Sequence, residues 1–175
     1  KIKKRTYKFF LINQDNFYPY SRNIFFLRFY FKKKLNLNYS NYVSKRYYIP
    51  RLNMHSKGRM IFEENKIIKD LKRNNFKILY PDKLTLVQQI KKFNEASIII
   101  APHGAALSNI IFKNKNCKII ELNGNKDVRW HYAKIMKDLK FWENYYLLIG
   151  TQKGDKYIEF DNKNLLNKIL EIIKN

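Results

Sequence analysis

Residues 97–109 read SIIIAPHGAALSN, and this stretch says more about the protein than any other part of its sequence. The apolar run at its start is typical of a buried strand, which ends in Pro-His-Gly and small residues. Glycine has no Cβ atom, so the backbone can come close to a ligand there. Residues 105–109 can begin a helix whose free N–H groups attract phosphate. The stretch therefore predicts an anionic ligand at the end of a buried strand.

Short apolar runs alternate with longer amphipathic segments on both sides of this stretch. We expect strands over residues 47–50, 76–80, 97–100, 117–122 and 145–149, with an edge pairing over 157–160. We expect helices over residues 63–75, 85–93, 128–139 and 162–173, and a short one that ends at Phe112. This alternation is typical of repeated βα units and predicts an α/β fold with a mainly parallel sheet.

Two of these helices carry finer signals. Thr85 followed by Gln88 predicts a capping box at the start of one. The helix over 128–139 presents four apolar residues at helical spacing, which we expect to face the core: Trp130, Ala133, Met136 and Leu139. We also expect the single cysteine, Cys117, to be a small core residue.

Residues 1–45 differ in composition and pattern from the rest of the chain. They are expected to form a separate segment before a domain over 46–175. Residues 8–13 are consistent with a strand, and 21–35 with a helix rich in Phe and Tyr. Such a helix must pack on something, and packing on the core is the favoured outcome. A missing N-terminal domain and a membrane surface, reached through Arg28 and Lys32 to Lys34, stay open. Residues 36–44 are expected to be a polar linker.

The chain has 175 residues and a formal net charge of +22. A charge of this size can attract nucleic acid, but the lysines are spread over the whole length and do not cluster on one element. We therefore expect no specific nucleic-acid partner. One cysteine, no apolar run long enough to span a membrane and no visible signal peptide favour a cytoplasmic protein, with the inner membrane face as a peripheral contact. The first methionine is Met54, so we expect a longer parent protein.

Ligands of parallel sheets bind beyond the carboxyl ends of the strands, where three loops, residues 50–59, 103–109 and 121–129, are expected to gather. Arg51 and Arg59 suit a diphosphate because a guanidinium donates two parallel hydrogen bonds. The glycine turn adds five further candidates: His103, Gly104, Ala105, Ser108 and Asn109. Glu121 ends a strand, where a carboxylate can accept hydrogen bonds from ribose. The alternative is that Arg51 and Arg59 are ordinary surface residues and that His103 has only a structural role.

Several kinds of chemistry lack their motifs in this sequence. The dinucleotide and P-loop glycine patterns are absent, as is the nucleophile elbow of acyl hydrolases. The three histidines have no zinc-protease spacing, and no Asp-x-Asp pair is present to hold a cation against a diphosphate. A site without metal, which neutralises phosphate with side chains and N–H groups, is therefore expected.

With these motifs assembled, the chain resembles the family 61 glycosyltransferases, which include capsular-polysaccharide-type enzymes and O-linked N-acetylglucosamine and xylose transferases. The resemblance rests on Arg51, RMIFEE from Arg59, VQQI at 87–90, APHGAALSNIIF at 101–112 and IIEL at 119–122. Order and spacing agree over residues 47–122. Two positions depart: Glu63 stands where members usually have Asn, and Ala106 where they have Gly.

The resemblance implies the C-terminal half of a GT-B enzyme, with a Rossmann-like sheet that holds a nucleotide sugar. The implied reaction is inverting transfer of the sugar to a hydroxyl of a glycan or other acceptor, with no cofactor other than the donor, for which a UDP-sugar is the first expectation. His103 is the catalytic candidate, although the general base is expected on a missing N-terminal half. A non-catalytic nucleotide- or polyanion-binding domain is the alternative, and an epimerase that uses Glu63 and Glu64 has little support.

Overall fold

The computed structural model describes residues 21–39, 44–51, 59–126 and 128–174. The strand predicted over 8–13 and most of the loop over 50–59 lie outside the described residues. The strands are β1 (Lys45–Tyr48), β2 (Met60–Ile61), β3 (Phe76–Ile78), β4 (Ala96–Pro102), β5 (Lys118–Gly124), β6 (Tyr145–Lys153) and β7 (Tyr157–Glu159). The α-helices are α2 (Ser21–Lys34), α3 (Glu64–Arg73), α4 (Leu86–Asn94), α5 (His131–Asp138) and α6 (Asn162–Lys174). Short 3-10 helices are η1 (Pro81–Lys83), η2 (Ala105–Phe112) and η3 (Trp142–Asn144).

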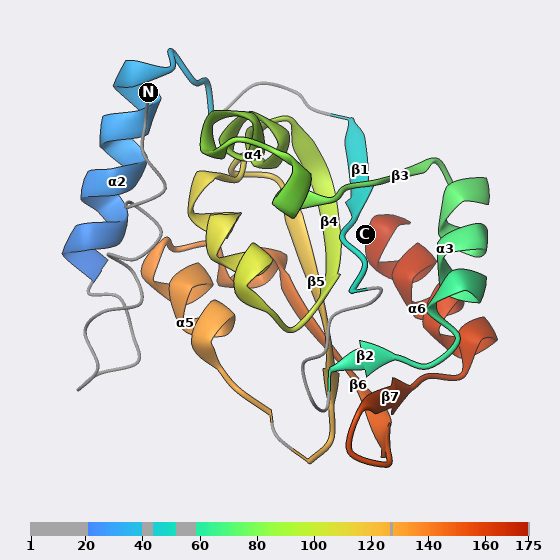
Figure 1. Ribbon diagram of the computed structural model, residues 1–175. Helices are drawn as coiled ribbons and strands as arrows, with labels where there is room; N and C mark the ends of the chain where they lie inside the picture. Colours follow the sequence, from blue (N-terminus) through green and yellow to red (C-terminus); the bar gives the residue numbers. More distant parts are fainter. Residues whose placement is uncertain (1–20, 40–43, 52–58, 127, 175) are drawn as a thin grey trace.

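The seven strands form one sheet in the order β2-β7-β6-β5-β4-β1-β3, flanked by helices (Figure 1). All neighbouring pairs are parallel except β6 and β7. This confirms the predicted α/β class with a mainly parallel sheet. After β2, at the far end of the sheet, the chain places β3 outside β1 and then returns past β1 to β4, so the order of the strands reverses between β1 and β4. Ligands of parallel sheets bind beyond the strand ends at such a reversal.

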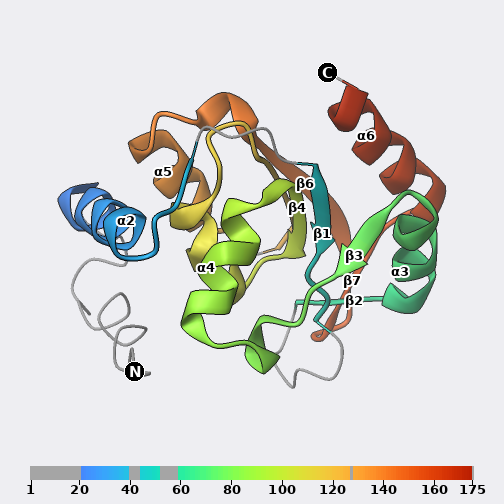
Figure 2. The same cartoon turned by 90° about the horizontal axis from the view of Figure 1, so that it is seen from above.

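Alternate residues of the central strands enter two separate cores, because successive side chains of a strand point to opposite faces. Tyr47 and Ile99 pack on one face with α2, α4, η2 and α5. Tyr48 and Ile100 pack on the other face with α3 and α6. Figure 2 shows these two helix layers on opposite sides of the sheet. The central strands are therefore covered on both faces and held rigidly.

The local predictions are largely confirmed. Thr85 and Gln88 form the predicted capping box of α4, and Cys117 is fully buried. Trp130 is a correction: the pattern predicted it inside, but it lies just before α5 and is 54% exposed. Tyr132 takes the inward position instead. The pattern also missed β2, which lies outside β7 at the end of the sheet, so β7 is not an edge strand.

Helix α2 lies on the outside of one helix layer and contacts α5 and η2 (Figure 1). Its inward side chains are Ile24 and Phe31, and the Phe31 ring meets the Phe112 ring edge-on at 5.3 Å. The described part of the predicted linker also packs inward, since Leu37 and Tyr39 are buried. No helix among the described residues is both long enough and apolar enough to cross a membrane.

Candidate functional site

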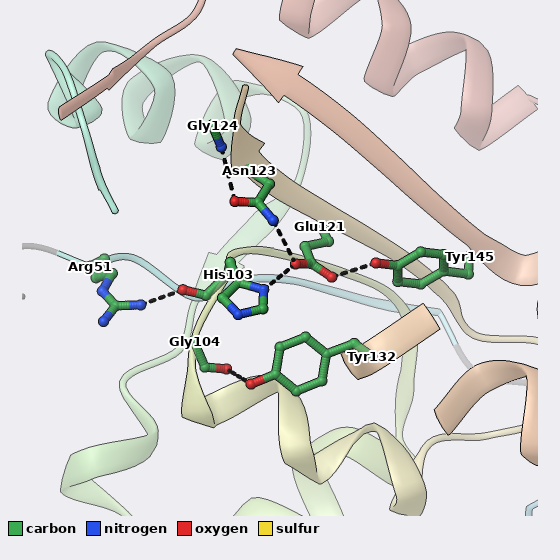
Figure 3. A network of polar contacts seen from close by, with 8 residues as sticks. All are labelled: Arg51, His103, Gly104, Glu121, Asn123, Gly124, Tyr132 and Tyr145. Atoms are coloured by element: carbon green, nitrogen blue, oxygen red, sulfur yellow. Dashed lines mark hydrogen bonds and ion pairs between the residues drawn. The ribbon is translucent and has the colours of Figure 1, made fainter. Parts of the chain in front are cut away.

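Three neighbouring strands bring several residues that were predicted from the sequence together near the carboxyl ends of the strands (Figure 3). Arg51 follows β1, His103 and Gly104 follow β4, and Glu121 lies in β5. Because β4 is hydrogen-bonded to both β1 and β5, the three groups are neighbours in space although they are distant in sequence. The site therefore lies where the strand order reverses.

A buried carboxylate fixes the orientation of His103. The Nδ1 atom of His103 lies 2.5 Å from Oε1 of Glu121, and neither side chain is more than 5% exposed. The hydroxyl of Tyr145 donates to the other oxygen of Glu121, and Asn123 Nδ2 lies 3.5 Å from Oε1. Burial, followed by the nearby Glu121 charge, raises the pKa of Tyr145 well above its usual range. The phenol therefore stays protonated and acts as a donor to Glu121.

This arrangement sets the role of each nitrogen of the His103 ring. A carboxylate only accepts hydrogen bonds, so Nδ1 must carry the proton that is shared with Glu121. The second ring nitrogen faces away from Glu121 (Figure 3). The ring also lies 5.1 Å from the Tyr132 ring, so its position is fixed by packing as well. One nitrogen of the ring is thus held by Glu121.

Arg51 lies across the glycine turn. Its guanidinium donates a short hydrogen bond to the backbone carbonyl of His103. A Cβ atom on Gly104 would overlap Nη1 of Arg51 and would lie 3.3 Å from its Cζ. Gly104 has extended backbone geometry, with φ at 174°, so space and not backbone strain accounts for the glycine. The glycine predicted to admit a ligand admits the arginine.

A second buried carboxylate positions the backbone of Arg51. Glu64, at the first position of α3, is 4% exposed and accepts hydrogen bonds from Tyr48 Oη at 2.6 Å and from the Arg51 amide at 2.9 Å. Burial raises the pKa of Glu64, although these two bonds oppose the shift. The adjacent Glu63 turns outward and pairs with Lys66 at 2.7 Å. Of the two glutamates, the buried Glu64 therefore belongs to the site.

Two arginines and a histidine beside this network lie close enough to affect one another electrostatically. Burial first, and then the nearby charge of Arg59, lowers the pKa of Arg51. Burial also lowers the pKa of His131, followed by the charges of His103 and Arg129. Arg51, Arg59 and His131 are all half-buried. The two guanidinium groups repel each other, which favours an anion as their common partner.

The first turn of η2 follows Gly104, which lies against Arg51. A 3-10 helix leaves its first amides without partners in the helix, and here the Leu107 amide already donates to the Gly104 carbonyl. The amides of Ala105 and Ala106 are the ones that the helix leaves open, and Ala105 is exposed. These two residues, and not the whole run to Ser108, are therefore suited to an anion.

Tyr132 of α5 packs against the turn at Gly104. Its hydroxyl donates to the Gly104 carbonyl at 2.6 Å and is also a hydrogen-bond partner of Ser108. Burial raises the pKa of Tyr132 to about 12. Ser108 is thus engaged with Tyr132, and the Gly104 carbonyl accepts hydrogen bonds from Tyr132 and from the Leu107 amide.

The structure connects most of the predicted residues, places Glu121 behind His103 and turns Asn109 elsewhere. The group brought together is Arg51, Arg59, His103, Gly104 and Ser108, and Ala105 follows Gly104 at the start of η2. Asn109 is 2% exposed and donates to Gln89 Oε1 at 2.9 Å, so it joins η2 to α4. Glu121 is fully buried, and both of its oxygens are engaged by His103 and Tyr145, which leaves it facing the histidine and not a ribose.

Sequence reasoning missed several members of the network: Tyr48, Glu64, Asn123, Tyr132 and Tyr145. Tyr48 and Tyr145 were expected only as strand residues, Tyr132 as part of a helix and Asn123 as part of a loop, while Glu64 was a weak carboxylate candidate. A buried tyrosine has the same spacing as any other core residue. One signal was available. A Tyr at a core position needs a partner for its hydroxyl, and a nearby carboxylate at a strand end can provide it. Within the described residues, no three His, Cys, Asp or Glu side chains are grouped as metal ligands.

Comparison with known proteins agrees with the motifs at this site. The family model described as Glycosyltransferase 61 matches residues 8–120, which include Arg51, Arg59 and the turn after β4. No curated protein matches the chain. The matched region covers more than half of the 175 residues and contains both the arginines and the histidine of the site. The chain therefore belongs to the glycosyltransferase 61 family.

Proposed function

We propose that this chain is the donor-binding part of an inverting glycosyltransferase of the GT-B type. Its donor would be a nucleoside-diphosphate sugar, with a UDP-sugar as the first candidate, and its acceptor a hydroxyl of a glycan. The observation that carries the proposal is the pair of half-buried arginines beside the first turn of η2, at the reversal of strand order. Family membership supports sugar transfer, and these residues suggest how the leaving group is held.

A diphosphate suits the charges of this site. Arg51 and Arg59 repel each other until an anion lies between them, and each guanidinium can donate two parallel hydrogen bonds to phosphate oxygens. The amides of Ala105 and Ala106, at the start of η2, would donate to a further oxygen. These residues would neutralise a diphosphate without a metal ion, which is why we propose a metal-independent site.

His103 would act on the leaving group. As the bond between the sugar and the diphosphate breaks, negative charge builds up on the phosphate oxygen, and a preorganised donor stabilises it. The ring is oriented by Glu121, so its second nitrogen can donate to that oxygen when the imidazole is protonated. In an inverting reaction the acceptor attacks from the opposite side of the sugar. The base that takes its proton would therefore lie opposite His103.

A titration with nucleotide tests the proposal. The chain is titrated with UDP, GDP and single-stranded nucleic acid by calorimetry at low and at moderate salt, with and without EDTA. We expect saturable nucleotide binding with a modest salt dependence and no effect of EDTA. A steep loss of nucleic-acid binding with salt, and no saturable nucleotide site, would support the polyanion-binding alternative instead.

Paired variants then locate the site. Arg59→Gln removes a charge from the proposed site, whereas Arg73→Gln removes one from the exposed face of α3, where Arg73 pairs with Asp70. Loss of a charge-assisted contact with phosphate is expected to weaken UDP binding by about 10- to 100-fold. Arg73→Gln should leave UDP affinity unchanged. Equal affinities for the two variants would remove Arg59 from the proposed site.

A further inference from the structure

The outer face of α2 is unusually aromatic for an exposed surface. Its inward residues, Ile24 and Phe31, are buried, but four large rings on the other side remain accessible. The exposed fractions are 46% for Phe25, 66% for Phe26, 56% for Phe29 and 42% for Tyr30. A helix that is apolar on nearly all sides is normally covered on all sides. The aromatic face of α2 therefore calls for a partner.

The helix is fixed in this orientation by Arg28. Its guanidinium donates to the backbone carbonyls of Ile111 at 2.5 Å and Lys113 at 3.0 Å, and its Cζ lies 3.6 Å from the centre of the Tyr39 ring. Rotation of α2 to bury the outer rings would break these contacts and would expose the Phe31 ring. The four outer rings are thus held outward by the fold.

The outer rings form a continuous surface with a cationic end. Phe25 and Phe29 are four residues apart, as are Phe26 and Tyr30, so each pair lies on adjacent turns. The rings of Phe26 and Tyr30 stack at 6.3 Å. The last turn consists of Lys32, Lys33 and Lys34, all exposed, and α2 contains no acidic residue. Two of these lysines lie against the rings, with Nζ of Lys33 4.6 Å from the Phe29 ring centre and Nζ of Lys34 5.2 Å from that of Tyr30.

The chemistry of this surface selects among partners. Lysine is depleted in the cores of protein interfaces, where its charge is costly to bury. A helix that lies in a membrane interface combines aromatic side chains on one face with lysines whose long stems reach the lipid phosphates. We propose that the outer face of α2 binds an anionic lipid surface. The four rings would enter the boundary between headgroups and acyl chains, and Lys32 to Lys34 would pair with lipid phosphates.

Vesicle binding by the 175-residue chain tests this proposal. The probes are vesicles of phosphatidylcholine alone and vesicles in which about a third of the lipid is phosphatidylserine. We expect co-sedimentation with the anionic vesicles and little with the neutral ones. Because the whole chain is strongly basic, binding to anionic vesicles alone does not support the proposal, and the variants below decide it.

A charge-matched pair separates the helix from the net charge. Lys32, Lys33 and Lys34 are replaced by Gln in one variant. In the control the exposed Lys163, Lys168 and Lys174 of α6, across the sheet from α2, are replaced by Gln (Figure 2). One lysine near an anionic surface contributes about a fivefold gain in binding, so the α2 variant should lose at least about tenfold in vesicle affinity. The α6 control should lose less than about threefold. Equal losses would overturn the proposal, because net charge alone would then account for binding.

An aromatic pair tests the second half of the surface. Phe26→Ser with Phe29→Ser is compared with Tyr80→Ser and Ile149→Ser, which remove exposed apolar side chains elsewhere. The α2 variant should lose about tenfold or more in vesicle affinity, since interfacial binding grows with the apolar area that is buried. The control should bind like the parent chain. Unchanged vesicle binding by the α2 variant would overturn the proposal. If the parent chain also self-associates and the α2 variant does not, the outer face of α2 binds a second copy of the chain instead.

Discussion

The contact between Gly104 and Arg51 gives the sharpest prediction, because one methyl group should act entirely through one arginine. In Gly104→Ala the new Cβ atom would overlap Nη1 of Arg51. Alanine adopts the extended backbone of residue 104 without strain, so the fold has no other reason to change. The end of the arginine must move instead, and the hydrogen bond from its guanidinium to the His103 carbonyl is lost.

The size of the effect follows from this bond. A hydrogen bond with a charged donor contributes about 1.5–3 kcal/mol when buried, and Arg51 is half-buried, so about 1–2 kcal/mol of unfolding free energy is expected here. Gly104→Ala and Arg51→Ala should each cost about this amount. The double variant should cost no more than Arg51→Ala alone, because the side chain that the methyl group displaces is already gone. The coupling free energy should therefore be about 1–2 kcal/mol.

Urea unfolding of the four proteins in this cycle measures the coupling. A second cycle pairs Arg51→Ala with Gly154→Ala as the control. Gly154 has φ at +60° and open space around its Cβ position, so alanine there costs about 1 kcal/mol of backbone strain with no link to Arg51. The control cycle should be additive within about 0.5 kcal/mol. Additivity of the Gly104 cycle as well would refute the idea that the glycine exists to admit the arginine.

Three further outcomes are expected. Tyr145→Phe leaves one buried oxygen of Glu121 without its donor and should lower the unfolding free energy by about 1–3 kcal/mol in urea unfolding, while Tyr146→Phe, a half-buried neighbour, should be near neutral. Burial lowers the pKa of Lys113 from 10.5 to about 8. Between these two pH values the unfolded chain binds more protons than the folded one, so the unfolding free energy rises with pH by on the order of 3 kcal/mol. Urea unfolding from pH 7 to pH 10.5 should show this rise in the parent chain and not in Lys113→Met. In an enzyme that contains this chain, Arg59→Ala should lower kcat/KM by about 30- to 1000-fold and chelation of metals should leave it unchanged; a loss under about threefold would exclude Arg59 from the transition state.

Much of the fold could be predicted because its signals are local. The apolar periodicity of α3, α4 and α6 and the capping box of α4 act within a few residues, and tertiary packing only reinforces them. Trp130 shows where this reasoning fails. It lies one residue before α5 begins, where the helical spacing no longer decides which way a side chain points. The strand β2 has only two residues and depends on pairing with β7 and on burial of Ile61, so no local pattern could reveal it.

The positions of the candidate site residues at the strand ends could be predicted, but their hydrogen-bond partners could not. Motif positions at strand ends indicated Arg51 and His103, since parallel strands bring their carboxyl ends to one edge. The same reasoning could not assign Asn109, whose partner Gln89 comes from α4, or Glu121, whose oxygens are engaged by His103 and Tyr145. These contacts depend on how helices and strands from distant parts of the sequence pack together.

The sequence by itself determined the class of fold, the family resemblance and the strand ends at which the candidate site lies, because periodicity and motif spacing are properties of the chain. Only the tertiary structure decided that Gly104 makes room for Arg51, that Glu121 holds His103 and that Glu64, not Glu63, supports the arginine. It also decided which rings of α2 stay outside, through the bonds of Arg28 to η2 and the residue after it. The physical reason is the same in each case: a buried polar group must find its partner, and the fold alone determines which partner is within reach.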